Sequence, residues 1–219
     1  FKELYRYGYK IFLQGASDVV FTKMYYPLIG KSFSSTQLGY YTNATSFSEI
    51  LVKQTTISYG RVLFPAMSKI QDDAEKLSRS YATIFRLLCF VMFPVTVIAI
   101  VSSHTFVDFF LTHKWLPAVP YMQLFLIEGF FFALYMLNQN TFNAIGKSGL
   151  SLKVDIIKKL LMFSSLFIAF NFGIKALIIG QVLSSFIVFI YSLLDIKRKL
   201  KIEMKFLFSE LHKLSLITM

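Results

Sequence analysis

The sequence predicts an all-α integral membrane protein built as a bundle of six transmembrane helices. The first observation is the composition: 55% of the 219 residues are hydrophobic and 16% are charged. Soluble domains usually have about 45–50% apolar and about 25% charged residues. The second observation is that the apolar residues fall into long runs, each near the ~20 residues that a bilayer requires. A soluble globular domain is therefore excluded.

Six candidate spans follow from these runs. They cover about residues 7–30, 44–70, 87–103, 120–143, 157–174 and 176–194. We expect turns at the membrane surface over Ser32–Asn43 and His104–Pro120, the latter with Trp115 as an interfacial anchor. Residues 1–200 would form one six-helix domain, and residues 201–219 a cytoplasmic linker with the start of a truncated further helix. The apolar ends predict an internal fragment of a longer protein.

The basic residues predict the orientation of the bundle. Sixteen lysines and arginines lie in one alternating set of connections, including Lys158 and Lys159 ahead of the fifth span. The other set holds only three, which are Lys31, Lys114 and Lys175. Cytoplasmic loops carry an excess of Lys and Arg. We therefore expect residue 1 and the end of the sixth span on the cytoplasmic side.

The first two spans are unusual because they carry charge well inside them. Asp18 and Lys23 lie in the first span, and Glu49, Lys53 and Arg61 lie in the second. A charged side chain at a helix centre costs about 2.5–3.5 kcal/mol on insertion scales. Such residues must pair, reach the interface, or face a wet cavity. We expect a cavity lined by these two helices.

Polar residues lie near these charges, and a cavity is not the only explanation for them. Gln14 continues a polar stripe with Asp18, and Gln54 adjoins Lys53. An ion pair between Glu49 and Lys53, four residues apart, is a competing explanation for both charges. Arg61 would be equally explained by reaching the cytoplasmic interface. Glu128 in the fourth span would serve ion coupling or pair with a lysine.

Several classes of function are disfavoured. The net charge of +11 would indicate nucleic acid in a soluble protein, but anionic lipid and topology explain it better here. The sequence lacks a glycine-rich phosphate loop and zinc-ligand spacing, so it predicts no cofactor, metal site or catalytic residues. Cys89 is the single cysteine and rules out an intrachain disulfide.

Four stretches resemble a known family. GKSFSSTQLGYYTNA (Gly30–Ala44), GRVLFPAMSKIQDD (Gly60–Asp73), KWLPAVPYMQ (Lys114–Gln123) and NAIGKSGLSLK (Asn143–Lys153) occur in order. They are similar to the bacterial polysaccharide or O-antigen repeat-unit flippases, in particular the lipopolysaccharide or colanic-acid-type exporters. These belong to the MATE-like multidrug/oligosaccharidyl-lipid/polysaccharide exporter superfamily, and the likeness covers nearly the whole chain.

The resemblance implies a two-lobed exporter with a central cavity, of which this chain would be the second six-helix lobe. It implies transport without covalent chemistry: undecaprenyl-diphosphate-linked oligosaccharides flipped across the bacterial inner membrane by alternating access. The expected partners are this cargo, membrane lipids and the missing N-terminal lobe. The first two helices of each lobe would line the cavity. Asp18, Lys23, Lys53, Gln54 and Arg61 are then the expected cavity residues.

Three alternatives remain open. A cation-coupled drug antiporter of the same superfamily should bury carboxylates in an apolar cavity. A membrane enzyme of polysaccharide assembly usually carries a large outer loop with arginine or histidine, whereas the expected outer loops have at most about 17 residues. A purely structural membrane subunit would not explain Lys23 and Lys53.

Overall fold

The computed structural model describes residues 2–200 of the chain. Within that range, the side chains of residues 2–7, 10, 14, 18, 22, 23, 53, 54, 57, 58, 169 and 170 are not described. The described part is helical almost throughout. Its elements are α1 (Lys2–Ser32), α2 (Ser35–Lys69), α3 (Ala74–Leu111), the short 3₁₀ helix η1 (His113–Ala118), α4 (Val119–Ala144), α5 (Ser148–Phe172) and α6 (Ile174–Leu200).

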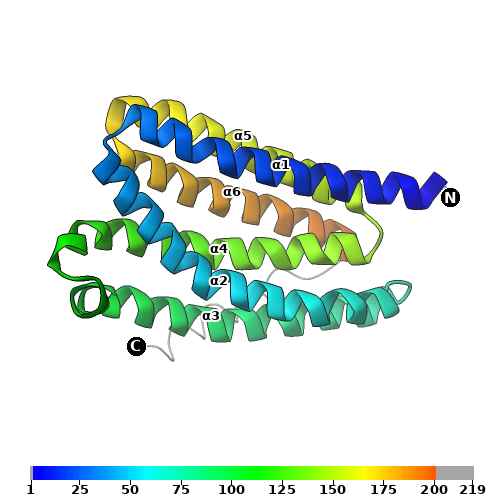
Figure 1. Ribbon diagram of the computed structural model, residues 1–219. Helices are drawn as coiled ribbons and strands as arrows, with labels where there is room; N and C mark the ends of the chain where they lie inside the picture. Colours follow the sequence, from blue (N-terminus) through cyan, green and yellow to red (C-terminus); the bar gives the residue numbers. More distant parts are fainter. Residues whose placement is uncertain (1, 201–219) are drawn as a thin grey trace.

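The helices form a bundle around α4. Helix α4 packs against α2, α3 and α6, while α5 packs against α6 and α1 lies mainly along α5. Figure 1 shows these helices running lengthwise, with α2 crossing α4 obliquely. The start of α1, the α2–α3 turn and the α4–α5 turn gather at one end of the bundle, and the other connections gather at the opposite end. Consecutive helices therefore alternate in direction.

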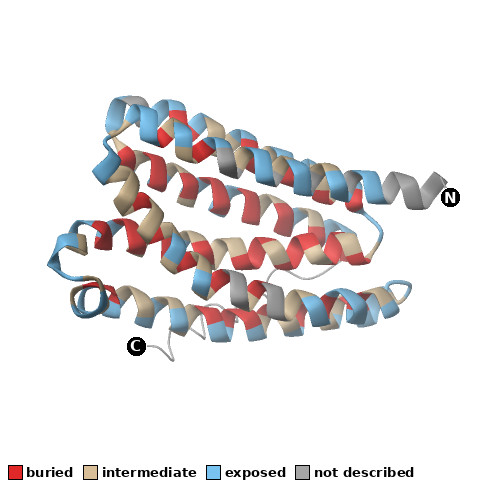
Figure 2. Ribbon diagram, in the orientation of Figure 1, coloured by how far each residue is buried: buried red, intermediate tan, exposed pale blue. Residues whose placement is uncertain are grey.

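Within residues 2–200, three segments are long and apolar enough to cross a membrane by length and composition. They are Ala74–Leu111, His113–Ala144 and Ile174–Leu200. Helix α3 also exposes large apolar side chains such as Phe90, Val101 and Phe109, and its outer face is coloured as exposed in Figure 2. Lipid can cover such a face without cost, whereas water cannot. The chain is a membrane protein, and residues 2–200 of it are all-helical.

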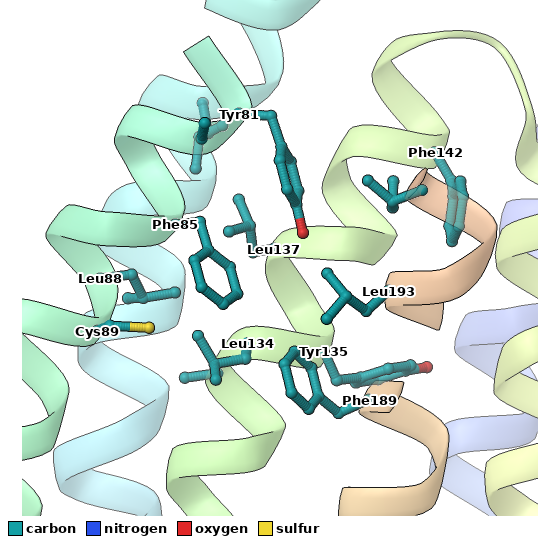
Figure 3. Close-up of a cluster of buried hydrophobic side chains, with 14 of the residues drawn as sticks. Tyr81, Phe85, Leu88, Cys89, Leu134, Tyr135, Leu137, Phe142, Phe189 and Leu193 are labelled. Atoms are coloured by element: carbon teal, nitrogen blue, oxygen red, sulfur yellow. The ribbon is translucent and has the colours of Figure 1, made fainter. Parts of the chain in front are cut away.

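A neutral core joins α3, α4 and α6. Tyr81, Phe85, Leu134, Phe142 and Phe189 are among its buried members, and Figure 3 shows them converging from the three helices. The stable packing of this core comes from tightly fitted large side chains.

One hydrogen-bonded chain crosses the neutral core. The Tyr81 hydroxyl donates to Asn138 Oδ1 over 2.6 Å, and Asn138 Nδ2 donates to Ser192 Oγ over 2.8 Å. The three side chains are fully buried. Their polar atoms are therefore satisfied inside the bundle, as buried polar groups require.

Glycines permit two close helix approaches. A Cβ on Gly129 of α4 would overlap the Val52 side chain of α2, and a Cβ on Gly180 of α6 would overlap Ser165 of α5. Small residues at such crossings let backbones approach closely in membranes. Ser184 and Ser185 follow Gly180 about one turn later in α6, so the α5–α6 contact lies on a face of small residues.

The turn predicted at Ser32–Asn43 is wrong in most of its length, because α2 begins at Ser35. Ser34 caps the helix by accepting from the Gln37 N–H at 3.2 Å. Thr42 and Thr45 bond back to helical carbonyls. These hydroxyls therefore fit a helix, although the polar composition resembled a loop.

The connection predicted at His104–Pro120 is also shorter than expected. Helix α3 continues to Leu111 and ends where Thr112 takes a positive φ of 74°. η1 follows and leads directly into α4. In η1, Trp115 packs edge-to-face on Tyr40 with ring centroids 6.0 Å apart.

The placement of Lys158 and Lys159 in a cytoplasmic connection is wrong. Helix α5 begins at Ser148, nine residues before the predicted start of the fifth span. Both lysines therefore lie in mid-helix and are buried. Acidic partners inside the bundle make this burial possible, as described below. The prediction for residues 201–219 lies outside the described residues.

Candidate functional site

A cavity of about 420 Å³ lies among α1, α2, α4, α5 and α6. This volume is within the range of small-molecule sites, about 300–1,000 Å³. Its lining combines aromatic rings, hydroxyls and charges. Among the described side chains, the charged lining residues are Glu49, Glu128, Asp155, Lys158 and Lys159.

Tyrosines build one wall of the cavity. The Tyr25 hydroxyl of α1 donates to the Met162 carbonyl of α5 over 2.6 Å. Gln181 Nε2 of α6 donates to the Tyr41 hydroxyl of α2 over 3.0 Å. The Tyr41 ring also packs edge-to-face on Phe125 at 5.2 Å. These tyrosines give the cavity wall apolar ring faces beside hydroxyl groups that are hydrogen-bonded to neighbouring helices.

Asp155 and Lys159 form a buried ion pair within α5. Lys159 Nζ contacts Asp155 Oδ2, and the same ammonium also donates to Ser17 Oγ of α1. The Tyr135 hydroxyl of α4 donates to Asp155 Oδ1 over 3.3 Å. Both charged side chains are buried, and a buried pair needs such extra hydrogen bonds to offset its desolvation. This cluster therefore ties α1, α4 and α5 together.

Glu128 and Lys158 form a second, wider pair across the cavity. Lys158 Nζ lies 3.9 Å from Glu128 Oε1, and Ser185 Oγ of α6 donates to that same carboxylate oxygen. The ammonium sits over the rings of Phe132 at 4.1 Å and Tyr135 at 4.9 Å. Cations over aromatic faces are stabilised by the ring quadrupole.

The lining can hold a polar, charged ligand. Rings offer stacking surfaces to sugars, hydroxyls and amides offer hydrogen bonds, and the lysines offer partners to anions. Three carboxylates and two lysines are among the described lining residues, so acids outnumber bases there. Among the described side chains, no group of three or more His, Cys, Asp or Glu is placed to hold a metal ion.

The predicted cavity residues fall into two groups. The side chains of Gln14, Asp18, Lys23, Lys53 and Gln54 lie outside the described residues, although their backbones belong to α1 and α2.

The other three predicted residues are described. Glu49 and Glu128 line the cavity, whereas Arg61 is exposed on α2 and is not among the lining residues. A role in cargo binding stays a prediction for every one of them.

The sequence reasoning missed Asp155, Lys158 and Lys159 as cavity residues. A signal was present, because Asp155 and Lys159 are four apart, the spacing that pairs charges on one helical face. Val154, Ile157 and Leu161 also recur at helical spacing around them. Charge density outweighed this pattern, so the stretch was assigned to a loop.

Fold and cavity together define a helical membrane protein with a charged, aromatic-lined chamber. The profile of the polysaccharide biosynthesis protein family matches residues 1–120 of the chain. The chain belongs to this family. The matched segment contains α1, α2, α3 and η1, and thus the Glu49 side of the cavity.

Curated relatives agree with this assignment. A membrane protein in the cps region of Klebsiella pneumoniae is 32% identical over 47% of this chain and 21% of its own length. The lipopolysaccharide biosynthesis protein WzxC of Escherichia coli K12 is 38% identical over 32% of this chain and 14% of its own.

The teichuronic acid biosynthesis protein TuaB of Bacillus subtilis 168 is 28% identical over 67% of this chain and 30% of its own length. The aligned part of this chain thus spans less than a third of the length of each of these relatives. No solved structure matches the chain.

Proposed function

We propose that the chain forms one half of the cavity wall in an exporter that moves polyprenyl-diphosphate-linked oligosaccharides across the bacterial inner membrane by alternating access. The observation that carries this is the charged, aromatic-lined cavity of about 420 Å³ inside a helical member of the polysaccharide biosynthesis family. Ionisable residues inside a membrane generally mark substrate or ion pathways.

The lining matches the chemistry of this cargo. The rings of Tyr25, Tyr41 and Phe132 supply flat apolar surfaces for sugar rings, and Gln181 and Thr45 supply hydrogen-bonding groups. Lysines supply charge for a phosphate. The proposal involves no covalent chemistry, cofactor or nucleic acid.

The proposal includes a second lobe and an orientation. All six helices would cross the membrane as one MATE-like lobe, with the missing N-terminal lobe closing the cavity from the other side. The end that carries Lys69, Lys76 and Lys147 would face the cytoplasm. Even when Lys158 and Lys159 are not counted, the connections at this end hold many more lysines and arginines than those at the other end, which supports the orientation.

Complementation tests this function. The natural gene, at whatever length it encodes, is expressed in a bacterium that lacks its own repeat-unit flippase, and surface polysaccharide is measured. We expect restoration by the wild type and loss by Lys23→Ala and Lys53→Ala at normal expression. Lys175→Ala, an exposed lysine at the start of α6, is the matched control and should complement fully. Full complementation by both cavity variants would remove the proposed role of those lysines.

A cation-coupled multidrug antiporter of the same MATE-like superfamily is the second candidate. One observation favours it: Glu49, Glu128 and Asp155 give the described lining more carboxylates than lysines. An antiporter would leave surface polysaccharide unchanged when deleted and would raise resistance to cationic drugs when overexpressed. Drug susceptibility assays on the same strains separate the two candidates.

A further inference from the structure

Two neighbouring lysines of α5 differ sharply in their surroundings. Lys158 and Lys159 are adjacent in sequence, buried to a similar degree, and both line the cavity. Because successive helical residues point about 100° apart, they meet different partners. The contrast between those partners assigns a different task to each lysine.

Lys159 is held as a structural cation. Its ammonium contacts Asp155 one turn earlier on α5 and donates to Ser17 of α1. Asp155 is fixed in turn by the Tyr135 hydroxyl at 3.3 Å. Removing either charge would leave the other buried without its partner, which is strongly unfavourable. Lys159 therefore joins helices.

Lys158 meets its carboxylate differently. Its Nζ is 3.9 Å from Glu128 Oε1, beyond the 2.7–3.2 Å of a direct N–H···O hydrogen bond. The carboxylate oxygen that faces the lysine also accepts from Ser185 of α6. Phe132 and Tyr135 support the ammonium from the side. An anion that came within hydrogen-bond distance of Nζ would gain a stronger, charge-assisted contact than Glu128 makes.

Glu128 can lose its contact with Lys158 and still be hydrogen-bonded and partly exposed. Its side chain keeps 20% of its surface exposed, while that of Lys158 keeps 10%. The Ser185 hydroxyl still donates to the carboxylate after the lysine turns to another anion. The exchange therefore costs less than breaking the Asp155–Lys159 pair would.

We propose that Glu128 is an internal stand-in for the anionic group of the cargo: it balances Lys158 until a phosphate or sugar carboxylate takes over that ammonium. The inference rests on the proposed function, since it names the contact that the cargo's charge makes in the cavity. It makes Glu128 a competitor of the cargo rather than a ligand for it.

Competition predicts opposite effects for the two members of the pair. Loss of Lys158 removes the binding charge and weakens anion binding. Loss of the Glu128 charge removes the competitor and strengthens anion binding. A residue that merely supports the cavity would weaken binding whichever member is changed.

The test measures anion binding by isothermal titration calorimetry, with the natural gene product purified in detergent. Inorganic pyrophosphate and glucuronate are the two probes, so that the phosphate and the sugar carboxylate are tested separately. We expect Lys158→Met to lower the affinity for whichever probe binds roughly tenfold or more. We expect Glu128→Gln to raise the affinity for the same probe about threefold. Lys153→Met, the same change at an exposed position of α5, is the control and should match the wild type.

The outcomes decide the proposal. The probe whose affinity follows this pattern identifies the source of the anion. Failure of the wild type to bind either probe, or weaker binding by Glu128→Gln, overturns the exchange. Thermal unfolding of each variant guards against misfolding, and Lys158→Arg, which retains the charge, should keep most of the affinity if Lys158→Met proves unstable.

Failure here is distinguishable from failure of the export proposal. If the wild type restores surface polysaccharide but Lys158→Met binds the probes normally, the exporter stands and the exchange falls. If the wild type and the two variants bind anions in the predicted order of affinity, but the wild type does not restore surface polysaccharide, the pair remains an anion site and the export proposal falls.

Discussion

The neutral core of α3, α4 and α6 and the charged cavity beside it both bury polar groups in the same bundle. In the neutral core, Tyr81, Asn138 and Ser192 satisfy one another and are fully buried. In the cavity, Glu128 and Lys158 stand 3.9 Å apart and keep part of their surface open. Polar groups in the neutral core fix the packing, whereas our proposal lets the Glu128–Lys158 pair of the cavity exchange partners.

Helix α4 belongs to both regions. Its Asn138 points into the neutral core, while Glu128 and Phe132 line the cavity. A rigid element that supports an adaptable site is a common arrangement for binding sites. The comparison therefore predicts that changes in the neutral core lower stability and that changes in the Glu128–Lys158 pair alter binding.

The largest loss of stability should follow truncation of a large side chain in the neutral core. Phe142→Ala removes a ring that is fully buried, and we expect a loss of about 3–5 kcal/mol. Phe109→Ala deletes the same ring from an exposed position of α3 and should change stability by less than about 0.5 kcal/mol. Thermal unfolding in mild detergent compares them, and equal losses would contradict the assignment of Phe142 to the core.

The next largest loss should come from Lys159, a cavity residue that is held by fixed partners as the core residues are. Lys159→Met strands the Asp155 carboxylate, so we expect a loss of about 3 kcal/mol in the free energy of unfolding. The double variant Lys159→Met with Asp155→Asn should recover much of it, because no lone buried charge remains. A double-mutant cycle by denaturant unfolding measures the coupling, and simple additivity would refute a structural pair.

A smaller loss is expected from the hydrogen-bonded chain. Asn138→Ala leaves the Tyr81 hydroxyl without its acceptor, which should cost about 1–3 kcal/mol. Adding Tyr81→Phe removes that stranded hydroxyl and should restore part of the stability. The midpoint of thermal unfolding is the readout, and a further fall in the double variant would show that the hydroxyl has another partner.

The smallest effect should lie outside both regions, at the start of α3. Asp73 caps this helix by accepting from the Lys76 N–H at 3.0 Å, and the Lys76 ammonium is also 3.0 Å away. These contacts lower the pKa of Asp73 below the ordinary value of an aspartate, 3.8. The contribution of Asp73 is therefore full above about pH 4 and is lost as pH falls through the lowered pKa.

Unfolding of the wild type and Asp73→Ala at pH 6 and at pH 2.5 tests this cap. We expect a modest stability difference at pH 6 that shrinks at pH 2.5. A difference that grew on acidification would mean that the carboxylate does not cap the helix through its charged form.

Much of the fold follows from the apolar runs. Helix α4 at Val119–Ala144 lies within a residue of its predicted span, and α1, α2, α5 and α6 contain most of theirs. The ends were harder to predict. Hydroxyl-rich sequence extends α2 back to Ser35, and α3 continues to Leu111 until Thr112 turns the backbone. Local hydrogen bonds decide such ends, and hydropathy does not record them.

Less of the site was predictable. Glu128 was expected as a cavity or coupling residue because it is a lone acid in an apolar span, and it lines the cavity. Lys158 looked like a loop residue because lysines cluster near it in sequence. Its burial depends on Glu128, which is 30 positions away, and on Phe132 and Tyr135. Such long-range compensation has no local sequence pattern.

The contact between Trp115 and Tyr40 has a practical consequence. Trp115 is the single tryptophan of this sequence, and it joins η1 to the first turns of α2. Its fluorescence in this chain therefore originates from one known place, the end of the bundle opposite the α2–α3 turn. Quenching of that emission by lipids brominated at different acyl positions would measure the depth of Trp115 in the bilayer.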